Sequence, residues 1–288
     1  MDLAAVIIVE TVYIIASLIL ISAGLAIVFG MMKVINLAHG EFMMMGGYAA
    51  ITAVNLGVNI YVAILIIAPL VVGLIGLIVE RLVIRHLYGR LIDTMLATWG
   101  LSLFFIGLVT MIFGNTTTGI STPIAGFPVG DYQINGYNFF IIVVTAVLML
   151  AIYLVLKGTR AGLIARGTMQ RADMADALGH SPDRIYMTTF FIGSAISGLA
   201  GAVLAPLVGL GPSSGGVYIA KAFITVIAGG PSVITGLISS GTVFGAVNQL
   251  FTFALSPVVG EVALLVSAVI LLRLLPQGIT ARFFRGKM

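Results

Sequence analysis

Long apolar runs, cut by glycine, proline or charged residues, recur along the whole chain. A transmembrane helix needs about 20 mostly apolar residues to cross a hydrocarbon core roughly 30 Å thick. The pattern therefore predicts an all-α polytopic membrane protein, with about 8–9 transmembrane helices in a single domain, residues 1–288. The expected spans are residues 5–30, 37–56, 60–79, 94–113, 138–156, 185–210, 217–229, 231–254 and 258–275.

Glycine and proline predict two broken helical elements, near residues 36–47 and near residues 229–231. The second is the run Gly-Gly-Pro, whose proline has no backbone N–H and whose glycines adopt many conformations. Paired discontinuous helices are typical of transporters built from inverted repeats. A shared Gly-Gly followed by Ile-Thr is consistent with such a repeat, whereas a plain tight turn would need none.

Three polar side chains, Asn36, His39 and Glu41, lie in the first broken element between two apolar stretches. Polar and ionisable groups beside hydrocarbon are costly unless they face protein, water or a solute, so they often mark transport pathways. The alternative is an ordinary cytoplasmic turn with Lys33 in the lipid interface. We favour a broken helix that lines a solute route.

Basic residues gather in the loops 80–93 and 157–184 and in the C-terminal tail, whereas the only charged residue of the segment 114–137 is Asp131. Loops rich in lysine and arginine stay on the cytoplasmic side of a membrane. We therefore expect the N-terminus outside and the C-terminus in the cytoplasm.

A short helical pattern, residues 171–178, lies within the basic loop 157–184. Gly179 and Pro182 follow it, and glycine and then proline commonly end a helix. Its charged and small side chains suit docking on a partner protein, although a solvated connector helix would have the same pattern.

Composition excludes several functions. The chain is 60% hydrophobic and 8% charged, whereas soluble domains carry about 25% charged residues. With a net charge of +4, no cysteine and three scattered histidines, it indicates neither nucleic-acid binding nor a metal site. The phosphate-loop pattern GxxxxGK[ST] and the hydrolase elbow G-x-S-x-G are both missing, so we expect neither an enzyme nor a cofactor in this chain.

The run INLAHGEFMMMGGY, residues 35–48, resembles the permeases of ABC importers for branched-chain amino acids, urea and short amides. In that family an N-x-A-H-G-E run followed by glycine and tyrosine is characteristic. Residues 87–103 and Tyr218-Ile219 resemble the urea-type branch, and the ending Leu-Pro-Gln-Gly, residues 275–278, resembles the common family C-terminus. The likeness is collinear over nearly the whole chain.

This resemblance implies a permease subunit of a bacterial inner-membrane importer that uses ATP-driven alternating access. The solute would be urea or a short amide, or a branched-chain amino acid. The implied partners are a second homologous permease subunit, two cytoplasmic ATPases that bind ATP and Mg²⁺, and a periplasmic solute-binding protein. A passive urea or amide channel and a proton-coupled carrier stay open, but scattered acids in the spans make a poor proton relay.

Part of the loop 157–184, the run DMADALG, resembles the importer coupling loop with its pattern E-A-A-x-x-x-G. Asp173 stands for Glu, Met174 and Ala175 for the two alanines, and Gly179 for the final glycine. The downstream Ile-x-Leu-Pro part of the pattern is missing. The residues expected to couple the chain to an ATPase are Arg171, Asp173, Met174, Ala175, Asp176, Leu178 and Gly179.

A route for a small polar solute needs scattered hydrogen-bonding groups in an apolar wall. The candidates are Asn36, His39, Glu41, Tyr48, Thr98, Trp99, Ser102 and Asn248. Each has a structural alternative. Thr98 and Ser102 could bond carbonyls of their own helix, Trp99 could anchor at the membrane interface, and His39 with Glu41 could form a structural pair.

Overall fold

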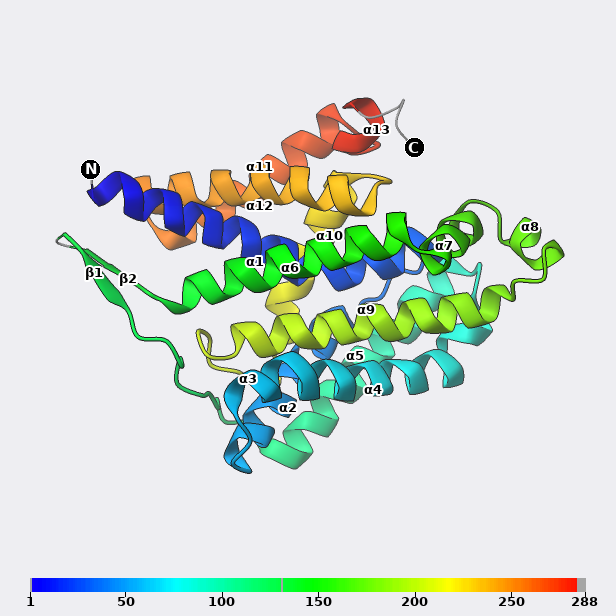
Figure 1. Cartoon of the computed structure of the whole chain (residues 1–288), viewed down its shortest axis with the longest axis horizontal. Helices are drawn as coiled ribbons and strands as arrows, with labels where there is room; N and C mark the ends of the chain where they lie inside the picture. Colours follow the sequence, from blue (N-terminus) through cyan, green and yellow to red (C-terminus); the bar gives the residue numbers. More distant parts are fainter. Residues whose placement is uncertain (1, 131, 284–288) are drawn as a thin grey trace. The chain divides into compact units, whose positions relative to one another are not determined.

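The computed structural model describes residues 2–130 and 132–283, and this part of the chain is almost entirely helical (Figure 1). The helices are α1 Asp2–Met32, α2 His39–Asn55, α3 Ile60–Val62, the π-helix η1 Ala63–Ile67, α4 Ala68–Leu82, the 3-10 helix η2 Ile84–Leu87, α5 Leu91–Phe113, α6 Tyr137–Gly158, α7 Arg160–Gln170, α8 Ala172–Ala177, α9 Pro182–Leu204, α10 Gly215–Gly229, α11 Val233–Ala254, α12 Pro257–Leu274 and α13 Ile279–Phe283. A small antiparallel hairpin pairs β1 Phe127–Val129 with β2 Tyr132–Ile134.

Seven helical segments in the described residues are long and apolar enough to cross a membrane. Every span expected from the sequence overlaps a helix, but the expected span 185–210 is too long, because α9 ends at Leu204. The helices α2 and α10 have only 17 and 15 residues. The chain leaves the helical conformation at residues 33–38, between α1 and α2, whereas residues 39–47 of the first expected broken element lie within a continuous α2. The second interruption, at residues 230–232 between α10 and α11, lies where a break was expected. The predicted all-α polytopic membrane fold is therefore confirmed. The inverted repeat stays a prediction.

The chain forms two compact units. One consists of residues 1–22, 122–151 and 221–288, and the other of residues 23–121 and 152–220. In the second unit, α9 packs against both α2 and α4 (Figure 1). Because it is covered in this way, α2 is buried along nearly its whole length.

Glycines make the packing of α2 on α9 close. A Cβ built on Gly46 would collide with the backbone of Gly198, and one built on Gly201 would collide with the backbone of Met43. Small residues let membrane helices approach until their backbones touch, which strengthens van der Waals packing where lipid supplies no hydrophobic drive. The Gly46-Gly47 pair therefore serves packing, since both glycines lie within a continuous α2.

The first unit has its own apolar core, in which the buried side chains are Leu18, Ala228, Phe244, Leu264 and Ala268. The helices α11 and α12 follow each other directly in the chain and pack together. The Ser256 hydroxyl accepts a hydrogen bond from the backbone N–H of Val259 and begins α12. The Thr280 hydroxyl donates to the carbonyl of Gly229 at 2.6 Å and ties α13 to the end of α10.

Candidate functional site

The break between α1 and α2 begins at Lys33, which has a left-handed backbone with a φ of 53°. Its N–H still donates to the carbonyl of Phe29 and closes the last turn of α1. Asn36, which is 4% exposed, then accepts a hydrogen bond from the Ala38 N–H through Oδ1 at 3.0 Å. The Asn36 side chain therefore helps to begin α2, because a side-chain oxygen near a helix start satisfies an N–H that the helix leaves unpaired.

Thr98 of α5 stabilises the same break from a different helix. Its hydroxyl accepts from the Leu37 N–H at 3.1 Å and lies 3.3 Å from the carbonyl of Ile35 and 2.8 Å from that of Thr94. Non-helical backbone at membrane depth must find hydrogen-bond partners within the protein. Thr98, which is fully buried, provides one for the backbone between α1 and α2.

His39 is buried between α2 and α9. Its Nδ1 lies 3.1 Å from the Ser197 hydroxyl, which also donates to the carbonyl of Gly193 at 2.8 Å. A histidine side chain 1% exposed thus forms a polar link between two closely packed helices.

Glu41, in the first turn of α2, is 3% exposed. The Oε2 atom of its carboxyl group is buried and has no hydrogen-bond partner among the described residues. Buried polar atoms in native proteins are nearly always paired, so an exception calls for a proton, a water or a ligand group at that oxygen. Of the predicted pathway residues, Glu41 carries the most direct sign of a function.

The remaining candidates lie in different surroundings. Tyr48 is buried and donates its hydroxyl proton to the carbonyl of Leu210 at 3.3 Å. Trp99 is 56% exposed and points away from the buried face of α5, which carries Thr98 and Ser102. Asn248 is buried in α11, in the other compact unit. The structure therefore gathers the polar residues of α2 with Thr98 and Ser102 in one unit.

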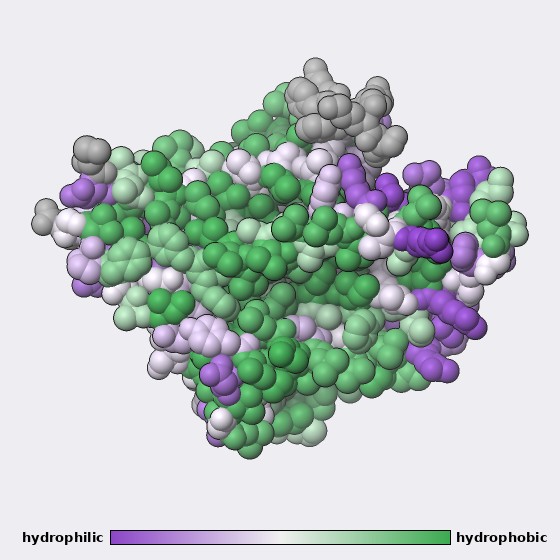
Figure 2. Space-filling model, viewed as in Figure 1, coloured by the Kyte–Doolittle hydropathy of each residue, from purple (hydrophilic) through white to green (hydrophobic). Residues whose placement is uncertain are grey.

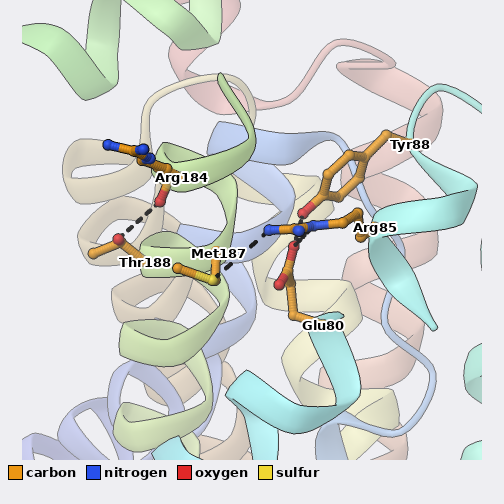
Figure 3. Close-up of polar contacts among 6 residues, drawn as sticks. All are labelled: Glu80, Arg85, Tyr88, Arg184, Met187 and Thr188. Atoms are coloured by element: carbon orange, nitrogen blue, oxygen red, sulfur yellow. Dashed lines mark hydrogen bonds and ion pairs between the residues drawn. The ribbon is translucent and has the colours of Figure 1, made fainter. Parts of the chain in front are cut away.

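Sequence reasoning missed a second buried carboxylate. Glu80, which the apolar pattern placed in a loop, is the single acidic residue of α4 and is completely buried. The Tyr88 hydroxyl donates to its Oε1, and Arg85 Nε lies 3.6 Å from the same oxygen (Figure 3). The sequence signal that could have found it is an acid at the end of an apolar run with an arginine close behind.

This cluster joins the segment after α4 to the beginning of α9. The Nη2 atom of Arg85 lies 3.8 Å from the sulfur of Met187 (Figure 3). The ring of Tyr88 packs edge-on against the ring of Tyr186, with the two ring centroids 5.0 Å apart. Burial raises the pKa of the Tyr88 hydroxyl, and its hydrogen bond to Glu80 raises that pKa further. The phenol therefore stays protonated and acts as a donor to the carboxylate.

The loop 157–184 contains α8 where the sequence predicts a short helix. Ala175 is buried, whereas Met174 and Leu178 are 58% and 78% exposed. The Nη2 atom of Arg171 donates a hydrogen bond to Oδ2 of Asp173 at 3.2 Å. This hydrogen bond lowers the pKa of the Asp173 carboxyl group. Figure 2 shows hydrophilic residues concentrated over α7 and α8, in contrast to the hydrophobic surface of the long helices.

Seven apolar segments, a broken helix and buried polar groups around α2 define a polytopic membrane permease. Residues 7–275 match the family described as the permease component of branched-chain amino acid transport systems, and the chain belongs to that family. The family membership implied by residues 35–48 is thus confirmed. The matched proteins are transport permeases and not enzymes, as we expected.

Relatives match over almost their full length. The permease LivH of a high-affinity branched-chain amino acid transport system from Salmonella typhimurium is 29% identical over 280 residues, covering 91% of each chain. BraD from Pseudomonas aeruginosa is 28% identical with the same coverage, and a probable LivH from Methanocaldococcus jannaschii is 26% identical, covering 91% of this chain and 88% of its own.

A solved structure, PsaBC from Streptococcus pneumoniae in complex with Fab, shares the fold. The TM-score is 0.52 at 15% sequence identity, and the match covers 97% of this chain and 94% of that one. At this identity the likeness supports the arrangement of helices alone.

Proposed function

We propose that this chain is a membrane subunit of a binding-protein-dependent ABC importer that moves a small polar solute by ATP-driven alternating access. The carrying observation is Glu41, a carboxylate buried beside a helix break with one oxygen lacking a partner in the described residues. A turn that faces the aqueous solvent would expose the Glu41 carboxylate. A solute route, in contrast, needs polar atoms buried among the membrane helices. Asn36, His39, Tyr48, Thr98, Trp99, Ser102 and Asn248 are the other proposed route residues.

The proposed assembly contains a second homologous permease subunit, two cytoplasmic ATPases and a periplasmic solute-binding protein in a bacterial inner membrane. The single permease domain, residues 1–288, would have its N-terminus outside and its C-terminus inside, as the basic loops indicate. The exposed Met174 and Leu178 of the α8 region support docking on an ATPase, because exposed apolar side chains beside charges are typical of protein interfaces.

A displacement of α8 would reach the solute route by way of α9. Only residues 178–181 separate these helices, and α9 packs closely on α2, which carries Glu41. Closely packed helices transmit displacement as rigid bodies because their interface cannot deform continuously. Closure of the ATPases would therefore shift α9 together with α2 and change access to the buried polar groups.

A branched-chain amino acid is the first candidate solute, since the relatives named above belong to transport systems for these amino acids. Urea or a short amide is the second candidate, because residues 87–103 resemble the urea-type branch. That run contains Thr94, Thr98 and Ser102, which are buried and uncharged and would suit an uncharged amide.

The test is uptake into proteoliposomes that hold the complete importer with its binding protein. We expect accumulation of leucine that requires ATP hydrolysis, with no effect of a proton gradient. Uptake of urea in place of leucine would support the second candidate. Equilibration without ATP would favour a passive channel, and accumulation driven by protons alone would favour a secondary carrier; either result would contradict the importer.

A further inference from the structure

Charged residues of the apolar helices α10 and α12 form an ion pair that the function proposed above does not use. Lys221 Nζ lies 2.7 Å from Glu261 Oε1, and both residues belong to the unit that contains residues 221–288. Other ion pairs in the described residues lie at helix ends or in the basic loops: Arg85 with Glu80, Arg90 with Asp93, and Arg171 with Asp173. The pair between α10 and α12 differs from these because it joins two apolar helices.

Both charged side chains of this pair remain partly accessible, 23% for Lys221 and 46% for Glu261. Charged groups directed at lipid are strongly disfavoured, and those found within membrane helices usually face a protein interior or a water-filled cavity. The partial exposure of Glu261 therefore indicates that this side of α12 meets water or polar groups.

Within the described part of the chain, both members of the pair have hydrogen-bonding capacity that their mutual contact does not use. The lysine ammonium has three donors and the carboxylate has two oxygens, and their mutual contact uses one of each. A zwitterionic amino acid carries a carboxylate and an ammonium on neighbouring atoms. Its carboxylate can bond the Lys221 ammonium while its ammonium bonds Glu261, so that every charge keeps an opposite charge beside it.

We propose that Lys221 and Glu261 form a contact site for the charged head group of a zwitterionic amino acid on its way through the permease. This inference rests on the proposed function, because it assumes that the permease has an aqueous solute route. The proposed site also specifies an amino acid as the solute, because urea and short amides have no separated charges for the pair to bind. With the expected topology, Glu261 lies about 6 Å along α12 from its outer end, near the entrance.

The first experiment measures water access and does not depend on transport. The chain has no cysteine, so single variants Glu261→Cys and Lys221→Cys can be treated from outside with a charged, membrane-impermeant thiol reagent. The matched control is Val262→Cys, 53% exposed, because it lies one residue further along α12, at nearly the same depth, and about 100° around the helix. We expect residues 221 and 261 to react about tenfold or more faster than 262, since the reactive thiolate forms in water.

The second experiment separates a solute contact from a structural ion pair. The double variant Lys221→Glu with Glu261→Lys keeps the two opposite charges but exchanges their positions. We expect it to accumulate in the membrane like the wild type while leucine uptake by the complete importer stays low, as in Glu261→Gln, because the exchanged charges would bind the head group in the reverse orientation and turn the leucine side chain away from its normal path. Restored uptake in the exchanged variant would show a structural pair and overturn the inference.

Two further results would also overturn it. Cysteines at 221 and 261 as unreactive as the one at 262 would place the pair away from water, whatever the importer transports. Reactive cysteines in a protein that carries urea but no amino acid would contradict the zwitterion site while leaving the importer intact. Failure of ATP-dependent uptake in the wild type would contradict the proposed function instead, and the thiol rates would still report on the pair.

Discussion

At the scale of single residues, the buried polar groups around α2 divide into those that satisfy backbone and those that do not. Asn36 and Thr98 bond N–H groups of the break, so part of their role is structural. Glu41 differs because its Oε2 has no partner in the described part of the chain. A buried carboxylate oxygen left unpaired weakens a structure, which favours a functional reason for keeping it.

Replacing Glu41 with Gln should therefore reduce uptake about tenfold, equivalent to about 1.4 kcal/mol, with little loss of folded subunit. The amide keeps the shape of the side chain, but the negative charge is lost. Uptake in proteoliposomes and the amount of subunit in the membrane are the measurements. Glu10→Gln is the matched control, because Glu10 lies in an apolar helix and bonds Asn138 at 2.9 Å. Equal losses of protein and uptake in Glu41→Gln would indicate a structural role.

A second residue-scale prediction concerns the cluster at Glu80. Tyr88→Phe removes the hydroxyl donor from a completely buried carboxylate, and an unpaired buried acceptor costs about 1–3 kcal/mol. We expect a lower midpoint of thermal unfolding in detergent. Tyr153→Phe, whose side chain is 44% exposed, serves as the control and should unfold like the wild type.

The same hydroxyl should give a pH-dependent difference between these proteins. Because the pKa of Tyr88 is raised in the folded state, the folded protein binds its phenolic proton more tightly than the unfolded chain does. This stabilisation is complete below the ordinary tyrosine pKa of 10.0 and is lost as the pH rises through the higher folded-state pKa. The difference in unfolding stability between the wild type and Tyr88→Phe should therefore narrow as the pH rises above 10.0. A difference that stays constant there would contradict the role of the Tyr88 hydroxyl as a donor to Glu80.

At the scale of elements, the sequence predicted the helices and their breaks well, because long apolar runs and the Gly-Gly-Pro punctuation are local signals. The sequence did not predict buried polar contacts whose partners come from other segments of the chain. The burial of Glu80 depends on Tyr88 and on the packing of α9, and the role of Thr98 depends on a backbone break 61 residues away. The hairpin of β1 and β2 was also missed, since two strands of three residues leave almost no periodic pattern.

The element-scale prediction concerns the end of α8. Gly179 has a φ of +84°, a left-handed conformation that costs a residue with a Cβ about 1–2 kcal/mol. Gly179→Val should change the direction of the chain between α8 and α9 and uncouple ATP hydrolysis from uptake, while the subunit still reaches the membrane. Gly167→Val, at an open helical position in α7, is the control. Unchanged uptake per ATP hydrolysed in Gly179→Val would contradict the docking role of this loop.

At the scale of the whole molecule, orientation in the membrane decides which loops meet which partners. The basic loops predict residues 115–135 outside and residues 160–182 inside. Single cysteines at Thr117 and Ser181 in this cysteine-free chain should react with an impermeant reagent from opposite faces of sealed vesicles. Labelling of both from one face would overturn the topology, and with it the assignment of α8 to the ATPase side.

The hydrogen bond between Leu37 and Thr98 restricts how this protein can move. The interrupted segment looks like a natural hinge, but any bending there that separates it from α5 would leave a backbone N–H unpaired within the membrane. The segment before α2 and the part of α5 around Thr98 must therefore move together. Flexing falls to their far ends, where Gly57 and Gly114 have φ values of +87° and +79° and open space beside them. The pivots of alternating access would then lie at the opposite membrane face from the break.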